Sequence, residues 1–219
     1  MGVSQRHATI SPVPDFIWHS PQSNRKTHLM RKPTKSTSRK TMARSEATPH
    51  KASAASLDTP TDLPREAVAA LSFSLNRLLA DAFALYLKTK NFHWHMSGPH
   101  FRDYHLMLDE QADQIFATTD PLAERVRKLG GKTLRSIGDI GRAQSLKDND
   151  KDFVSPRDML LELLQDNKAM AHAMREAHEL CEDHQDAATA SILEVYIDET
   201  ERRTWFLFEA SRDADRTGH

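Results

Sequence analysis

Apolar side chains recur every three or four residues over long stretches of the chain, a spacing that is typical of amphipathic helices. The first stretch, 65–95, begins after Pro64, a residue that suits a helix start, and ends before Gly98-Pro99. Its apolar positions recur at this spacing: Leu71, Leu75, Leu78, Leu79, Ala82, Phe83 and Leu87. The pattern predicts a first helix over 65–95.

A second periodic stretch, 101–129, is closed by two glycines. At 1.5 Å per residue it predicts a helix about 43 Å long. Pro121 lies inside this stretch, where it lacks a backbone donor and clashes with the carbonyl of Ala117, at a cost of about 3 kcal/mol if nothing compensates. We therefore expect a kink at residues 117–121.

The next segment, 132–154, contains two glycines and a polar run, so it is expected to be a crossover connection with at most one short helix. Ser155 suits an N-cap, and the proline after it suits the first helical position. A third helix is predicted over 156–182 and a fourth over 185–211. This order predicts an all-α fold, a ferritin-like four-helix bundle with a long crossover between helices 2 and 3.

The first part of the chain differs in texture, since residues 1–60 are rich in Ser, Thr, Pro, Lys and Arg and show no sustained apolar periodicity. Such a segment cannot bury enough surface to offset its ordering entropy. We expect three parts: a disordered basic N-terminal extension over 1–60, a folded domain over 61–212 and a short C-terminal tail over 213–219.

The net charge also differs between the N-terminal segment and the rest of the chain. Residues 1–56 carry ten lysines and arginines against Asp15 and Glu46, a net charge of +8, which leaves −9 on the remainder. A multivalent basic tail binds DNA without sequence preference through its phosphates. Three alternatives are a solubilising tail, an organelle transit peptide and a misassigned start, because translation from Met42 would remove most of the basic residues.

The single cysteine, Cys181, allows no internal disulfide and favours a reducing compartment, so a cytoplasmic location is expected, with nucleoid association if the tail binds DNA. We expect no contact with a membrane, because no uninterrupted apolar run approaches the roughly 18 to 20 residues that span a bilayer.

Histidines and carboxylates cluster near the turn between the first two helices. His105 and Asp109 are four residues apart on one helical face, and Asp120 and Glu124 repeat this spacing further along. His93 precedes the turn by about as much as His105 follows it, so an antiparallel hairpin brings the two imidazoles to one level.

One chain cannot bring both pairs to one metal, because fifteen residues separate His105 from Asp120, roughly 22 Å along a helix. Two copies that pack their second helices antiparallel about a two-fold axis would form two composite sites. Each site would join His93, His105 and Asp109 of one chain to the carboxylate pair of the other. Mixed imidazole and carboxylate ligands suit Fe(II), Mn(II) or Zn(II).

The alternative is that each pair is only a solvated helix face or a local salt bridge, since Arg125, Arg127 and Lys128 lie close by. Three further histidines are expected to be structural or on the surface: His95, His100 and His172, which stands four residues before Glu176.

The segment 90–131 resembles the signature region of the Dps family, the starvation-induced DNA-protecting ferritins. The family motif is a His-Trp pair, a second His twelve residues after the first, an Asp four further on, and an Asp-x-x-x-Glu pair eleven beyond. The chain reproduces this spacing without a gap in His93-Trp94, His105, Asp109, Asp120 and Glu124. The resemblance extends in helical pattern over 61–212, which makes this part a ferritin-like Dps domain.

The resemblance implies a ferroxidase that prefers hydrogen peroxide, with iron held by ligands from two subunits, inside a hollow shell of twelve identical chains. In the ferroxidase site that this resemblance implies, Fe(II) is held by His93, His105, Asp109 and Glu124. Asp120 binds a second, weaker iron or organises water. Trp94 either traps stray oxidising equivalents or is a packed interface aromatic.

Two other functions are weighed against this one. The first is a nucleoid-binding structural protein that acts through the basic tail. The second is a conventional di-iron bundle, which carries two Glu-x-x-His motifs in one subunit. No Glu in this chain has a His three residues later, which disfavours the second.

Overall fold

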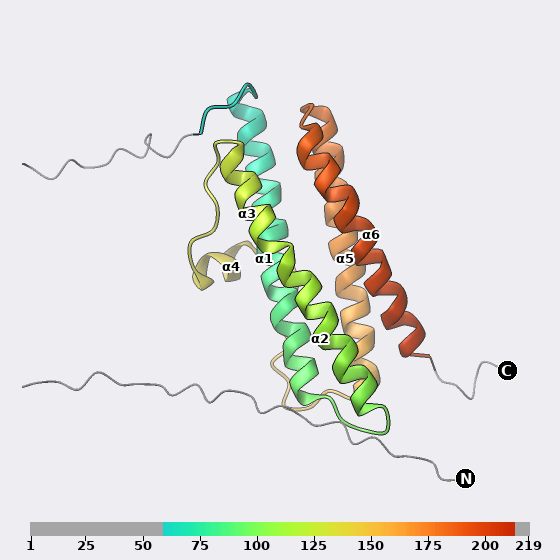
Figure 1. Cartoon of the computed structure of the whole chain (residues 1–219). Helices are drawn as coiled ribbons and strands as arrows, with labels where there is room; N and C mark the ends of the chain where they lie inside the picture. The colour runs from blue at the N-terminus through green and yellow to red at the C-terminus, as the bar shows by residue number, and fades with distance from the viewer. Residues whose placement is uncertain (1–58, 213–219) are drawn as a thin grey trace, which may run out of the picture. The chain divides into compact units, whose positions relative to one another are not determined.

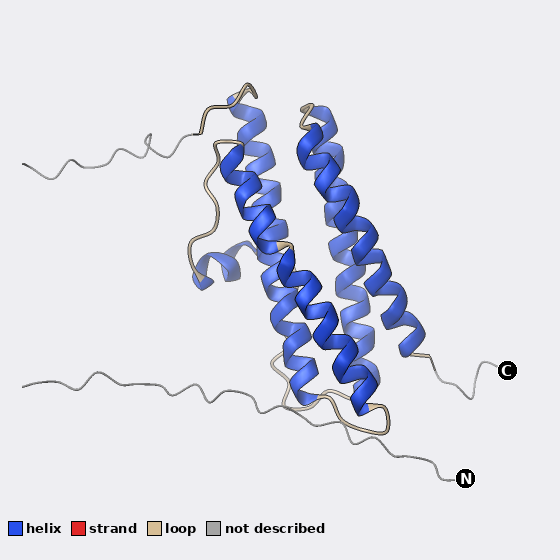
Figure 2. Cartoon of the chain, in the orientation of Figure 1, coloured by secondary structure: helices blue, strands red, loops and turns tan. Residues whose placement is uncertain are grey.

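The computed structural model describes residues 59–212, and all regular structure in that range is helical. The fold is an all-α, ferritin-like four-helix bundle, as expected from the sequence, and Figures 1 and 2 show its long helices packed side by side. The elements are α1 (Arg65–His95), α2 (Phe101–Ala117), α3 (Thr119–Lys128), α4 (Ile137–Ala143), α5 (Pro156–Asp183) and α6 (Ala187–Ala210). The predicted extension over 1–60 lies almost wholly outside the described residues, as does the tail over 213–219.

The bundle consists of two helical hairpins. Helix α1 packs against α2 and α3, α5 packs against α6, and contacts between α1 and α5 join the hairpins. Leucine is the most frequent residue of the core, and nine leucines are at most 1% exposed: Leu71, Leu75, Leu85, Leu108, Leu122, Leu160, Leu163, Leu193 and Leu207. The short helix α4, inside the predicted crossover, lies against α1 (Figure 1).

The predicted kink is a break between two helices. Helix α2 ends at Ala117 and α3 begins at Thr119, so Pro121 falls in the first turn of α3, where its missing donor costs little. The hydroxyls of Thr118 and Thr119 donate hydrogen bonds to the carbonyls of Ile115 and Phe116, at 2.8 and 2.7 Å. A continuous helix over 101–129 was therefore wrong, whereas the position of the kink is confirmed.

The predicted N-cap of α5 is confirmed, and α6 also has a side-chain cap at its start. The Ser155 hydroxyl accepts a hydrogen bond from the Asp158 amide at 3.2 Å, and the Asp186 carboxylate accepts one from the Thr189 amide at 3.1 Å. Gln185 has a φ of 60°, so it lies in the turn before α6 rather than in the helix.

Buried polar contacts fix the remaining segments to the bundle. The Asp81 carboxylate in α1 accepts hydrogen bonds from the Ser145 amide and hydroxyl and from the Leu146 amide, at 2.6, 2.6 and 3.0 Å. These bonds fasten the crossover to the core. Lys88 of α1 pairs with Asp166 of α5 at 2.7 Å, so the two hairpins are also joined by charge.

Helix α1 is long and apolar enough, by length and composition, to span a membrane, with a mean hydropathy of 1.4 in its most apolar window. Charged residues interrupt every 18-residue stretch of α1, so the expectation of no uninterrupted apolar run of that length holds. Half of that window is buried in the bundle, and α1 also carries the buried, paired Asp81 and Lys88. Its apolar residues supply the core of the domain.

Candidate metal centre

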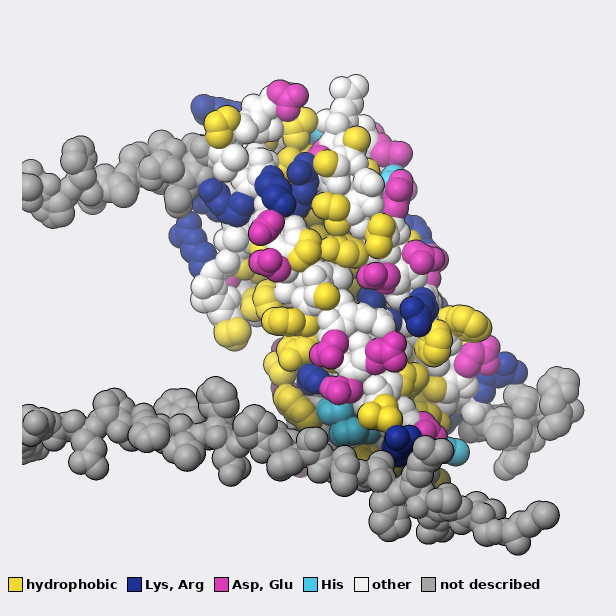
Figure 3. All heavy atoms as spheres, in the orientation of Figure 1, with side chains coloured by type: hydrophobic (Ala, Val, Ile, Leu, Met, Phe, Trp, Pro, Cys, Tyr) yellow, Lys and Arg dark blue, Asp and Glu magenta, His cyan; other side chains and the backbone are white. Residues whose placement is uncertain are grey.

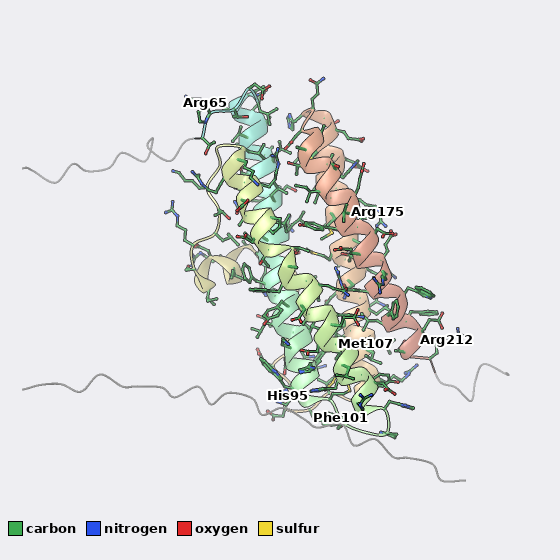
Figure 4. All side chains as sticks on the ribbon, viewed as in Figure 1. Arg65, His95, Phe101, Met107, Arg175 and Arg212 are labelled. Atoms are coloured by element: carbon green, nitrogen blue, oxygen red, sulfur yellow. The ribbon has the colours of Figure 1, made fainter. Side chains whose placement is uncertain are left out.

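The hairpin between α1 and α2 brings His93 and His105 together, as their spacing predicts. Gly98 in the turn has a φ of 95°, which favours glycine, and its carbonyl accepts a hydrogen bond from the Phe101 amide at 3.0 Å. The two imidazole rings are stacked, with centroids 3.7 Å apart and planes at 21°. Figure 3 shows the histidines gathered near this end of the bundle, and Figure 4 labels His95 and Phe101 on either side of the turn.

Each imidazole is oriented by the backbone of the other residue. His93 Nδ1 lies 2.7 Å from the His105 carbonyl, and His105 Nδ1 lies 2.9 Å from the His93 carbonyl. A carbonyl oxygen only accepts, so both Nδ1 atoms carry the proton. In the neutral rings the Nε2 atoms then carry the lone pairs, which is the arrangement that a metal-binding histidine needs.

Asp109 lies one turn beyond His105, and its Oδ1 is 3.8 Å from His93 Nε2. The same oxygen accepts a hydrogen bond from the Lys90 ammonium group. That bond lowers the pKa of Asp109 and raises the pKa of Lys90. The Asp109 side chain is 45% exposed, so its carboxylate is accessible to a ligand that displaces Lys90.

The second pair, Asp120 and Glu124, lies in α3, and both residues are exposed. Glu124 is paired with Lys128 at 2.8 Å, and this hydrogen bond lowers its pKa. The local salt bridge weighed from the sequence is therefore present on this helix. Arg125 turns away from the pair to Asp186, at 2.7 Å.

The single chain brings together only the first three of the five predicted ligands: His93, His105 and Asp109. Over residues 59–212 no group of three or more His, Cys, Asp and Glu side chains has a geometry that could hold a metal ion. The Asp120 and Glu124 carboxylates belong to a separate helix, beyond the break at Thr118.

The three further histidines named from the sequence lie outside this constellation. His95 is exposed and its Nδ1 donates to the Asn91 carbonyl at 2.8 Å, while His172 pairs with Glu176 on an exposed face at 3.5 Å. His100 contacts the Tyr104 ring with centroids 5.5 Å apart. Trp94, next to His93 in sequence, is 60% exposed.

Lys90 is the residue of the site that sequence reasoning missed. It stands three residues before His93, so it faces the same side of α1, and that spacing is the signal that could have found it. Asp113, four residues after Asp109, contributes to the raised pKa of Lys90, so the acidic stripe on α2 extends one turn beyond the predicted ligands.

Comparisons with known proteins point to one family. The ferritin-like domain family matches residues 74–216. A low temperature-induced protein of Nostoc sp. is 34% identical over 148 residues, which cover 67% of this chain and 81% of the relative. A DNA protection during starvation protein of Agrobacterium fabrum is 32% identical over 149 residues, 68% of this chain and 92% of the relative.

A solved structure agrees with these relatives. The chain is similar to a Dps protein from Vibrio cholerae O1, described as a member of a broad superfamily of ferritin-like diiron-carboxylate proteins. The TM-score is 0.65 at 26% identity, and the match covers 68% of this chain and 94% of that one.

Proposed function

Because this chain belongs to the ferritin-like Dps family, we propose that it is a mini-ferritin subunit that oxidises Fe(II) at sites shared between two identical chains. Hydrogen peroxide is the preferred oxidant, and the ferric product is stored in a hollow shell of twelve chains. Iron is the substrate and cargo of this protein.

The observation that carries the proposal is the pair of stacked, backbone-oriented imidazoles beside Asp109. Two Nε2 lone pairs and one carboxylate form half of a mixed nitrogen and oxygen ligand set for a borderline metal such as Fe(II). Glu124 of a second chain supplies a further anionic oxygen, and Asp120 binds a second, weaker iron or organises water.

An exposed apolar stripe beside the half-site supports pairing with a second copy. Phe73, Leu87 and Trp94 follow one another on α1 at seven- or fourteen-residue intervals, so they fall on one side of the helix, and each is more than half exposed, at 68, 58 and 60%. Ile137 of α4, a helix that packs on α1, is 82% exposed. Yellow apolar side chains flank the histidines in Figure 3. An antiparallel partner that covers this face brings its α3 toward the half-site.

The negative charge of the carboxylate ligands favours the oxidation of iron. Anionic carboxylates stabilise Fe(III) over Fe(II), so ligands such as Asp109 and Glu124 lower the cost of oxidation. Peroxide accepts one electron from each of two Fe(II) ions and, with two protons, yields two waters and two Fe(III) without releasing a hydroxyl radical. Lys90 neutralises Asp109 before iron arrives, and iron displaces it.

A complementation experiment tests the shared site. His93→Ala and Glu124→Ala chains, each alone, are expected to lose peroxide-dependent Fe(II) oxidation. When the two are refolded together, half of the dimers are mixed, and each mixed dimer regains one site with all its ligands intact. About a quarter of the wild-type sites, and of the rate, should return.

Co-assembled chains that stay inactive would refute the sharing of ligands between chains, and wild-type rates in either single variant would refute the site. His172→Ala, a change in an exposed histidine outside the site, serves as the matched control and should oxidise iron at the wild-type rate.

A nucleoid-binding structural role is the second candidate, favoured by the charge of +8 on residues 1–56. Those residues lie outside the described part of the chain. A salt-sensitive shift of DNA by the full chain, lost on deletion of 1–56 while iron oxidation is kept, would support it. Mass spectrometry of the native N-terminus distinguishes a start at Met1 from one at Met42.

A further inference from the structure

A buried arginine of α6 lies where side chains of α2 and α6 line a small cavity. Arg203 is 3% exposed. Its Nε donates to Asn167 Oδ1 at 3.0 Å and its Nη2 to Thr200 Oγ1 at 2.6 Å. Neither partner carries a charge. The third guanidinium nitrogen, Nη1, has no hydrogen-bond partner in the described structure.

Burying a guanidinium without a carboxylate is costly, so a residue of this kind calls for an explanation. Burial lowers the pKa of Arg203 to about 10, so the group is still a cation at neutral pH. Glu199 favours the charged form through space, but no ion pair joins it to Arg203.

Arg203 borders a cavity of about 30 Å³ between the two helices. Gln111, 4% exposed, forms part of its wall from α2, and Gln114 and Met107 lie beside it. Arg202 and Glu110, both exposed, form the rim; Arg202 is held 5.5 Å above the Phe206 ring, and Glu110 accepts a hydrogen bond from Gln114 at 3.2 Å. Met107 is labelled on the α2 side in Figure 4, and Figure 3 shows basic side chains where α6 faces α2.

We propose that this cavity is a binding site for one small oxyanion of the phosphate class, held by the Arg203 guanidinium with Gln111 and Arg202. A planar guanidinium with a free N–H suits an oxyanion, and a buried amide supplies a second donor. The cavity is too small for a nucleotide. The site lies outside the iron ligands, so it does not rest on the proposed function.

Calorimetric titration of inorganic phosphate into the iron-free full chain tests the proposal. The wild type is expected to bind phosphate, and its thermal midpoint is expected to rise with phosphate concentration by linkage. Arg203→Met should weaken binding at least tenfold, and its midpoint should no longer respond to phosphate. Arg202→Gln should weaken binding less, because Arg202 is at the rim.

Arg175→Gln is the matched control, since Arg175 is an exposed arginine that pairs with Glu201 away from the cavity. It should bind phosphate as the wild type does. If Arg203→Met fails to fold, a crystal structure of the wild type grown with phosphate decides, because the ion must lie within hydrogen-bond distance of Arg203 Nη1. Equal binding by Arg203→Met and the wild type, an adventitious ion only, or a carboxylate of another chain at Nη1 would each overturn the proposal.

Discussion

The two halves of the proposed iron site are built differently. His93 and His105 are fixed by reciprocal hydrogen bonds to each other's backbone, and His93 is 8% exposed. Asp120 and Glu124 are exposed on a ten-residue helix that follows a break. The first half is therefore arranged before any metal arrives, whereas the proposed assembly needs a partner chain to bring the second half to the metal.

Replacing one ligand from each half should give the largest effects and should differ in size. His105→Ala removes an oriented ligand and also the donor to the His93 carbonyl, so Zn(II) affinity is expected to fall about 100-fold or more, as when a ligand and its orienting contact are lost together. Glu124→Ala removes one exposed carboxylate and should cost about tenfold. Calorimetry on the assembled, iron-free protein measures both, and equal losses would contradict the comparison.

Lys90→Met should strengthen metal binding by the first half of the site. Without the Lys90 hydrogen bond, the pKa of Asp109 rises toward its ordinary value, while at neutral pH the carboxylate stays ionised and free for metal. Zn(II) should bind about three- to tenfold more tightly, and carbon-13 NMR of the Asp109 carboxyl should show the pKa rise.

Lys128→Met is the matched control from the second half. Its partner Glu124 is exposed, and a solvent-screened pair of this kind contributes little. Metal affinity should change less than in Lys90→Met. If both lysine variants bind metal as the wild type does, Lys90 does not compete with iron for Asp109.

Pro121→Ala should have the smallest effect. Proline in the first turn of α3 costs no hydrogen bond and restricts the unfolded chain, so its removal should lower stability by up to about 1 kcal/mol. Thermal unfolding measures this loss. Iron oxidation should stay within about twofold of the wild-type rate, since the threonine hydroxyls at the break remain. A large loss of activity would show that the break itself positions Asp120.

The same contrast explains what the sequence could predict. Periodicity located the long helices, and Pro121 located the break, because both are local effects. The position of His93 opposite His105 followed from their similar distances, in residues, from the turn between the two helices. The spacing of Lys90 and His93 places Lys90 on the side of α1 that carries the site, but its ion pair with Asp109 joins two helices and so depends on side-chain packing. The unpaired Nη1 of Arg203 depends on how α2, α5 and α6 pack together, which a local sequence pattern does not describe.

The buried thiol of Cys181 can be used to measure how often this bundle opens. It is the chain's single cysteine, it is 1% exposed, and burial raises its pKa to about 12. A thiol reagent therefore reacts only when α5 separates from its neighbours and the sulfur meets water. The rate of labelling then reports how often the domain opens, and the protein carries this reporter without any engineered label.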